Sequence, residues 1–131
     1  MPPEIPWLRA GLLIDFILAL YPASRRDASY REQVLQQLHL CDVLGVPMGV
    51  LSAGMAKKVL LAATLIAAPA VLLFDEPVNE IDAASCDTLV SLLAAYQSDR
   101  IILVATHHFA PFKDLIASTL TIGQAEKARA R

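Results

Sequence analysis

The sequence predicts an α/β fold: a partial parallel sheet of about three strands, preceded by a small helical subdomain at the N-terminal side. The last two-thirds of the chain alternates short apolar runs with helical patterns, which is typical of parallel strands joined by crossover helices. The strand segments are apolar at nearly every position, as expected when both faces of a sheet are covered. We therefore divide the chain into a helical part, about 10–50, and a sheet-forming part, about 51–131.

The helical part begins after a proline-rich extended segment. A helix over 11–21 stops at Pro22, and a second helix runs to about Leu40. The apolar run 10–21 contains Asp15 and is far shorter than the ~20 residues that a membrane span needs. We read it as a buried or interface helix, for which a membrane-embedded subunit is a plausible partner.

The sheet-forming part alternates helices and strands. A helix from Ser52 or Gly54 to about 67 is ended by Pro69, because proline cannot continue a helix. Helices over 83–97 and 111–117 separate the later apolar runs. The predicted strands are 71–75, 101–105 and 118–122.

Composition limits the partners of this chain. The net charge of −2 over 131 residues gives no indication of a nucleic-acid partner. Cys41 and Cys86 have no metal-ligand spacing, and no secretory signal is visible, so we expect a cytoplasmic protein. Apolar residues make up 56% of the chain, and three strands form a poor two-sided sheet. We infer that the chain is the later half of a larger α/β domain, whose exposed sheet edge needs the missing half.

Two adjacent carboxylates follow the first predicted strand, in Val-Leu-Leu-Phe-Asp75-Glu76-Pro77. An aspartate at the end of a parallel strand can hold Mg²⁺, and a glutamate beside it can orient or deprotonate an attacking water. The alternative is a polar strand end that starts a turn at Pro77.

Three further segments carry candidate site residues. Leu-Ser52-Ala-Gly54-Met precedes a helix, whose N-terminus is a ready anion site, although Ser52 also suits an ordinary helix cap. Asp82 closes the loop after the carboxylates and can cap the next helix. The second strand ends in Thr-His107-His108, and a histidine there can donate a hydrogen bond to a phosphate. We assign that role to His107, with His108 as the alternative.

In this order and at these spacings, the segments resemble the C-terminal half of the nucleotide-binding domain of ATP-binding cassette (ABC) transporter ATPases, which have a P-loop NTPase-type sheet. The resemblance implies that Asp75 holds Mg²⁺, that Glu76 is catalytic and that His107 is the switch histidine at the γ-phosphate. It also implies that Ser52 and Gly54 contact ATP bound to the other protomer.

Two weaker correspondences complete the resemblance. Asp82 matches the aspartate of the D-loop, which crosses the dimer interface, and Glu4 lies where many cassettes have the glutamine of the Mg²⁺-sensing loop. The sequence departs from the family's Leu-Ser-Gly-Gly-Gln at Ala53 and Met55. A cassette also needs a P-loop, G-x-x-x-x-G-K-[ST]. Gly49 and Gly54 have the required spacing, but Met55 follows in place of lysine, so no P-loop is present in this sequence.

The resemblance implies a cytoplasmic ATP-binding and ATP-hydrolysing subunit, or a fragment of one, peripheral at the inner face of the membrane, that energises transport. Its cofactors are ATP and Mg²⁺, both only in the completed cassette. Its partners are a P-loop-bearing half or second cassette protomer and a membrane-embedded transporter subunit. One alternative is a non-catalytic interaction or regulatory module derived from an ABC ATPase. Another is a metal-dependent hydrolase that uses Asp75, Glu76, His107 and His108.

Overall fold

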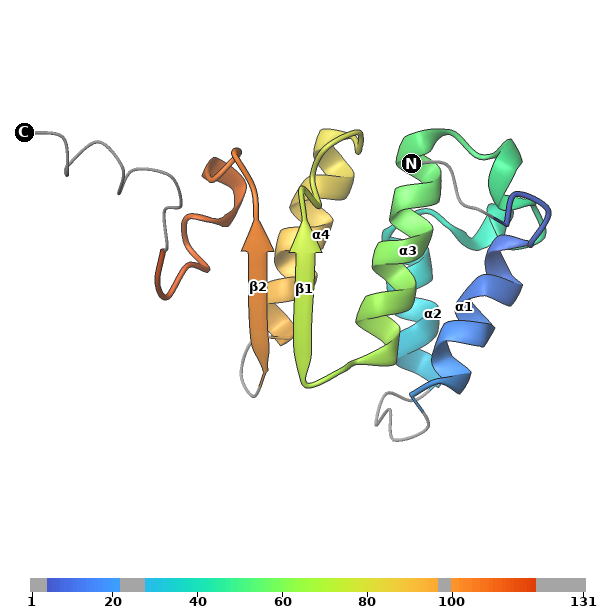
Figure 1. The fold of residues 1–131 in the computed structure, drawn as a ribbon, viewed down its shortest axis with the longest axis horizontal. Coiled ribbons are helices and arrows are strands. Elements are labelled where there is room, and N and C mark those ends of the chain that lie inside the picture. Colours follow the sequence, from blue (N-terminus) through green and yellow to red (C-terminus); the bar gives the residue numbers. More distant parts are fainter. Residues whose placement is uncertain (1–4, 22–27, 97–99, 120–131) are drawn as a thin grey trace, which may run out of the picture.

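The computed structural model describes residues 5–21, 28–96 and 100–119, and Figure 1 shows how its elements are arranged. Its elements in chain order are α1 (Ala10–Ala19), α2 (Ala28–Gln37), η1 (Cys41–Val43), η2 (Met48–Val50), α3 (Ala53–Ala67), β1 (Val71–Asp75), α4 (Ala83–Tyr96), β2 (Ile101–Ala105) and η4 (Ala110–Phe112), where η denotes a 3-10 helix. None of the helices in these ranges has the length and apolar character needed to cross a bilayer.

The central helix α3 joins the helical part to the sheet. It packs against α1 and α2 on one side and leads directly into β1 on the other (Figure 1). Most of its residues from Lys58 to Ala67 are buried, so α3 is apolar around much of its circumference. Ile14 of α1, Val34 of α2 and Val59 of α3 are fully buried in one shared core.

The ends of α3 follow from local chemistry. The hydroxyl of Ser52 accepts a hydrogen bond from the amide of Met55 at 3.2 Å, which satisfies one of the free amides of the first turn. At the other end Ala68 adopts a left-handed conformation (φ 50°), and Pro69 follows. The helix therefore begins and ends where the sequence predicted.

Within the described residues the sheet has two parallel strands, with Val71 opposite Ile101 and Asp75 opposite Ala105. Figure 1 shows α4 behind both strands, and Leu72 and Phe74 of β1 are buried in the same core as residues of α4. No described element covers the other face, which we call the bare face. Its apolar side chains are 48–71% exposed: Val71, Leu73, Ile101 and Leu103.

This arrangement corrects two expectations, and a third falls mostly outside the described residues. Apolar strands suggested a sheet covered on both faces, but within the described residues helices cover only one. The helix expected over 111–117 is a single 3-10 turn, η4. The third strand, 118–122, lies mostly outside the described residues, and Ser118 and Thr119 are not in a strand. The sequence pattern cannot reveal whether a face of the sheet is covered, because apolar residues look the same whether or not a partner covers them.

Candidate active site

The carboxyl ends of β1 and β2 lie side by side and place the candidate site residues at one edge of the sheet. The amide of Glu76 donates to the carbonyl of Ala105 at 2.8 Å, which extends the strand pairing one residue beyond Asp75. Glu76 then adopts a left-handed conformation, with φ 45°. A non-glycine residue in this region is uncommon and often marks a functional constraint.

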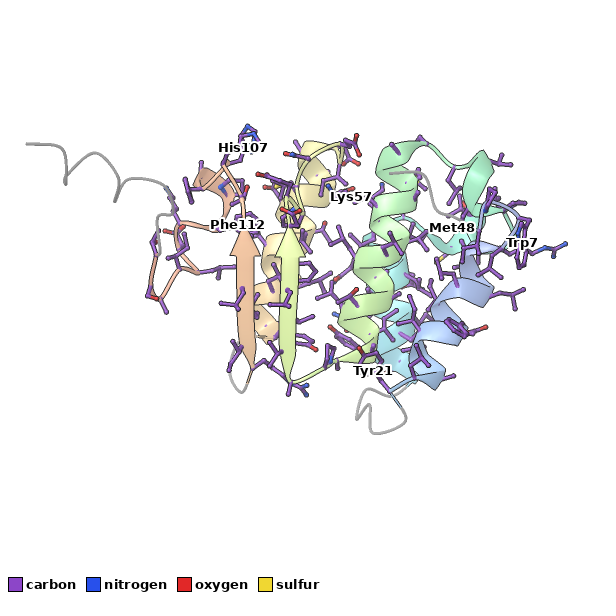
Figure 2. All side chains as sticks on the ribbon, in the orientation of Figure 1. Trp7, Tyr21, Met48, Lys57, His107 and Phe112 are labelled. Atoms are coloured by element: carbon purple, nitrogen blue, oxygen red, sulfur yellow. The ribbon has the colours of Figure 1, made fainter. Side chains whose placement is uncertain are left out.

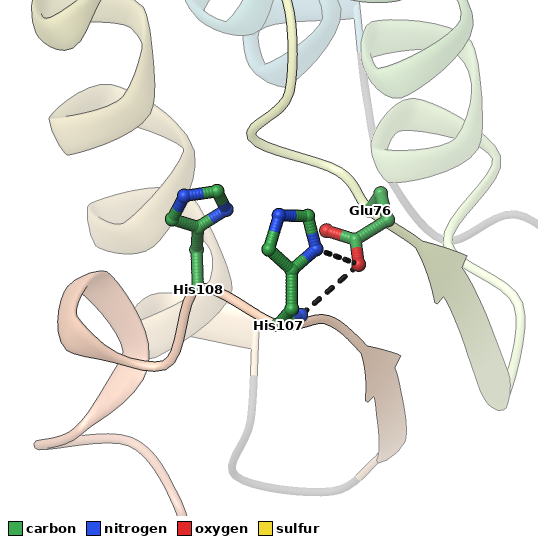
Figure 3. A group of neighbouring side chains, drawn as sticks. All are labelled: Glu76, His107 and His108. Atoms are coloured by element: carbon green, nitrogen blue, oxygen red, sulfur yellow. Dashed lines mark hydrogen bonds and ion pairs between the residues drawn. The ribbon is translucent and has the colours of Figure 1, made fainter.

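The carboxylate of Glu76 is held by the end of β2 (Figure 3). Its Oε2 accepts from the hydroxyl of Thr106 at 2.9 Å. Its Oε1 accepts from the amide of His107 at 3.0 Å and lies 2.6 Å from Nδ1 of the same residue. An ionised carboxylate only accepts hydrogen bonds, so Nδ1 carries the hydrogen and Nε2 is left as the free ring atom.

These contacts favour the ionised form of the carboxylate. The hydrogen bond from the His107 side chain, together with that from Thr106, lowers the pKa of Glu76 below its ordinary value, although burial acts in the opposite direction. Glu76 is therefore ionised at neutral pH and can accept a proton or a hydrogen bond from water.

His108 extends the group through contacts with Thr106 and His107. Its amide donates to the Thr106 hydroxyl at 3.0 Å, and its ring centroid lies 4.0 Å from that of His107. Figure 3 shows both imidazoles on the side of the loop that faces Glu76. The geometry therefore makes His107, and not His108, the partner of Glu76, a contact that the sequence did not predict.

Asp75 is the last residue of β1 and is exposed. Exposed and buried residues alternate along β1, and Asp75 is exposed like Val71 and Leu73. It therefore lies on the bare face with them. Mg²⁺ is usually held by one or two carboxylates together with water and substrate phosphates. A single exposed carboxylate at a strand end fits that donor set.

The segment before α3 approaches the loop after β1. A Cβ atom at Gly54 would lie well under 3.0 Å from the carbonyl oxygen of Glu80, whereas Cβ atoms essentially never approach another heavy atom closer than that distance. Only glycine therefore fits at this position, where the first turn of α3 packs against the loop 76–82. Sequence reasoning singled out Gly54 for phosphate contact and missed this packing requirement.

Asp82 caps α4 within a network of hydrogen bonds. Its carboxylate accepts from the amide of Ser85 at 2.8 Å and from the Ser85 hydroxyl at 2.7 Å. Lys58, buried in α3, donates to Asp82 at 3.3 Å and to Ser85 at 3.2 Å. The side-chain and backbone hydrogen bonds from Ser85, followed by the contact with Lys58, lower the pKa of Asp82.

Two neighbouring lysines of α3 were missed by sequence reasoning. The ammonium of Lys57 donates to the carbonyl of Glu76 at 2.6 Å, and Figure 2 shows its side chain between α3 and the end of β1. Lys57 and Lys58 together tie α3 to both ends of the loop 76–82. Two consecutive lysines in a largely apolar helix could have indicated these contacts, because a lysine is seldom buried without a partner.

The structure brings together some of the predicted residues and not others. Glu76 and His107 are in direct contact, and Gly54 meets the loop that ends at Asp82. The Ser52 hydroxyl accepts from the first turn of its own helix. Glu4 lies outside the described residues.

Comparison with known proteins agrees with this geometry. Residues 11–79 match the sequence model of the family described as "ABC transporter". The chain belongs to this family. It is 38% identical over 99 residues to the phosphonates import ATP-binding protein PhnC of Pseudomonas putida, covering 75% of this chain and 36% of that protein. It is 34% identical over 110 residues to the aliphatic sulfonates import ATP-binding protein SsuB 1 of Xanthomonas axonopodis pv. citri, covering 81% and 44%.

A solved structure supports the fold. The putative cobalt transport ATP-binding protein superposes with a TM-score of 0.67 at 24% identity, covering 80% of this chain and 39% of that one. The resemblance stated from the motifs and the predicted α/β fold class are thus confirmed. This chain spans less than half the length of the relatives described here.

Proposed function

We propose that this chain is the part of an ABC nucleotide-binding domain that activates water for ATP hydrolysis and, once completed by a P-loop-bearing half, energises transport. The observation that carries this proposal is the contact of Glu76 with Thr106 and His107 at the carboxyl ends of two parallel strands. Open α/β sheets bind their ligands at that edge.

Each residue of the group has a task in this proposal. Glu76, kept ionised by its hydrogen bonds, orients the attacking water and accepts its proton. His107, with its Nδ1–H directed at Glu76, has Nε2 free for the side of the γ-phosphate. Asp75 would hold Mg²⁺, which supplies positive charge to the phosphates when bound. Lys57 keeps the Glu76 backbone in position.

The start of α3 would serve a second nucleotide. The hydroxyl of Ser52 accepts from Met55 through its oxygen, so its hydrogen remains free to donate to an anion. With the free amides of the first turn this makes a phosphate contact for ATP held by another protomer. Asp82 and its loop, which pack against Gly54, would lie at the same interface.

The bare face of the sheet fits the P-loop-bearing half. Leu73 is 71% exposed and Ile101 is 58% exposed, while parallel sheets are almost always covered on both faces. The segment of each named relative that matches this chain is less than half of that relative's length. The missing half would therefore bury this face and bring its P-loop beside Asp75 and Glu76.

The outer side of α1 fits the membrane-embedded subunit. Leu12, Phe16 and Leu20 recur every four residues, form one stripe, and are 55–62% exposed. We assign this stripe to the helical subdomain, about residues 10–50, as its docking surface. Such docking would hold the cassette at the cytoplasmic face of the membrane. We assign Glu4 to the Mg²⁺-sensing loop on its resemblance to the family alone.

Calorimetry tests the assembly step. Mg-ATP is titrated into the full chain alone and then with a P-loop-bearing half supplied as a separate chain. We expect tight binding only in the second case. Leu73→Asp, on the bare face, should prevent association of the halves, whereas the matched variant Leu12→Asp, on α1, should leave it intact. Equal binding by both variants would contradict the assignment of the bare face.

A further inference from the structure

The end of β2 offers three metal-ligating side chains in one place: Glu76, His107 and His108. One ligand atom from each lies within 4.8 Å of the other two. From this geometry we propose that the three residues form a site for a borderline transition-metal ion, with Zn²⁺ as its representative, and that such an ion switches off the ATPase. The switching effect rests on the function proposed above, whereas the binding site does not.

The donor set selects the class of ion. Two imidazole nitrogens and one carboxylate oxygen are a familiar set for Zn²⁺, with water in the fourth position. Mg²⁺ prefers oxygen ligands in an octahedron, so excess Mg²⁺ competes poorly for two imidazoles. Asp75, on the bare face, is not part of the group, which separates the proposed Zn²⁺ site from the proposed Mg²⁺ ligand.

The spacing needs only a small adjustment. Ligand atoms about 2.1 Å from a tetrahedral ion are about 3.4 Å from each other. The 2.6 Å between Nδ1 of His107 and Oε1 of Glu76 must widen, and no separation among the three ligand atoms exceeds 4.8 Å. The side chain of His107 is 66% exposed, so its ring can rotate without disturbing the core. That exposure also provides the path of entry.

The surrounding hydrogen bonds hold the ligands in place. The Thr106 hydroxyl donates to the carboxylate oxygen that does not face His107, and it accepts from the amide of His108. Partners of this kind orient metal ligands and commonly change metal affinity 10–100-fold. Thr106 thus links two of the three ligands within one short loop.

An ion at this site would occupy the groups that hydrolysis needs. A metal bound to Glu76 takes the lone pair that would otherwise accept the proton of water. A metal on Nδ1 of His107 requires that Nδ1 has lost its hydrogen and that the ring has rotated, so Nε2 no longer lies where it would face the phosphate. ATP binding by the P-loop would continue, so inhibition would lower kcat with little change in KM for ATP.

The test measures binding and inhibition separately. Zn²⁺ is titrated by calorimetry into the full chain, prepared without a histidine tag and in excess Mg²⁺, and tetrahedral coordination is checked by the absorption of bound Co²⁺. We expect one ion per chain and at least tenfold weaker binding in His108→Asn. The matched control is His39→Asn, because His39 is the only other histidine and asparagine tolerates its left-handed backbone (φ 56°). It should bind Zn²⁺ like the unaltered chain.

The ATPase of the completed cassette provides the second measurement. Zn²⁺ should inhibit the unaltered chain, and His108→Asn should keep its activity and resist inhibition. Equal Zn²⁺ affinity in all three chains, or none in any, would overturn the site. Tight binding that leaves hydrolysis unchanged would overturn the switch. An assembly without ATPase activity would instead count against the proposed function, since the binding measurement needs no hydrolysis.

Discussion

Gly54→Ala is the substitution whose effect follows most directly from the structure. In an open helix, alanine stabilises relative to glycine by about 1 kcal/mol. Here the added Cβ would overlap the carbonyl oxygen of Glu80, which is backbone and cannot rotate away. Either α3 or the loop 76–82 must move. Overpacking typically costs about 1–3 kcal/mol, and a backbone clash belongs at the upper end.

The net expectation is a loss of about 2 kcal/mol in unfolding free energy, the difference between about 3 kcal/mol of strain and about 1 kcal/mol of helix propensity. Urea denaturation measures it: with a slope of about 2 kcal/mol/M, the midpoint should fall by about 1 M. Gly45→Ala is the matched control, since nothing lies within 4 Å of the Cβ that it adds. If the Gly54→Ala variant is as stable as the unaltered chain, the predicted clash with Glu80 is wrong.

Three further predictions concern the lysines and the acids that they contact. Lys58→Met, which keeps the length of the side chain, should destabilise the fold less than Asp82→Ala. Asp82→Ala leaves the buried Lys58 ammonium without its carboxylate. The urea midpoints of the two variants show which substitution destabilises more. The pKa of Asp82 is lowered on folding, so its contribution to stability is present above the ordinary aspartate pKa of about 3.9 and is lost as pH falls through the folded-state pKa. Urea unfolding from about pH 6 to about pH 2 should therefore show a steeper loss of stability than in Asp82→Asn; parallel curves would contradict this. Lys57→Met should lower turnover of the completed cassette at least tenfold while changing ATP binding little, because it frees the Glu76 backbone; unchanged turnover would show that this contact is dispensable.

Several helix and strand boundaries could be predicted because particular residues in the sequence mark them. Ser52 and Pro69 bracket α3, and the carboxylates at 75 and 76 mark the end of β1. Local chemistry determines each of these boundaries, so one sequence is enough to place them. The end of the second strand at Ala105 was placed in the same way, from the polar Thr106 that follows it, whereas the contact of His107 with Glu76 was not predicted.

The remaining features depend on tertiary contact. The bare face of the sheet looks like a covered one in the sequence, because Leu73 and Leu72 are equally apolar. The left-handed backbone at Glu76 and Glu80 has no residue signal, since neither is glycine or asparagine. The partners of Lys57 and Lys58 lie across the fold from them, so only the folded chain reveals which carbonyl and which carboxylate they reach.

The most direct test of the account is ATP turnover by the chain completed with a P-loop-bearing half, measured for Glu76→Gln and for Glu80→Gln. Both substitutions exchange a carboxylate for an amide of equal size in the same loop, but only Glu76 contacts Thr106 and His107. We expect Glu76→Gln to bind Mg-ATP without hydrolysing it, and Glu80→Gln to hydrolyse it normally. Comparable turnover in the two variants would contradict the central role of Glu76.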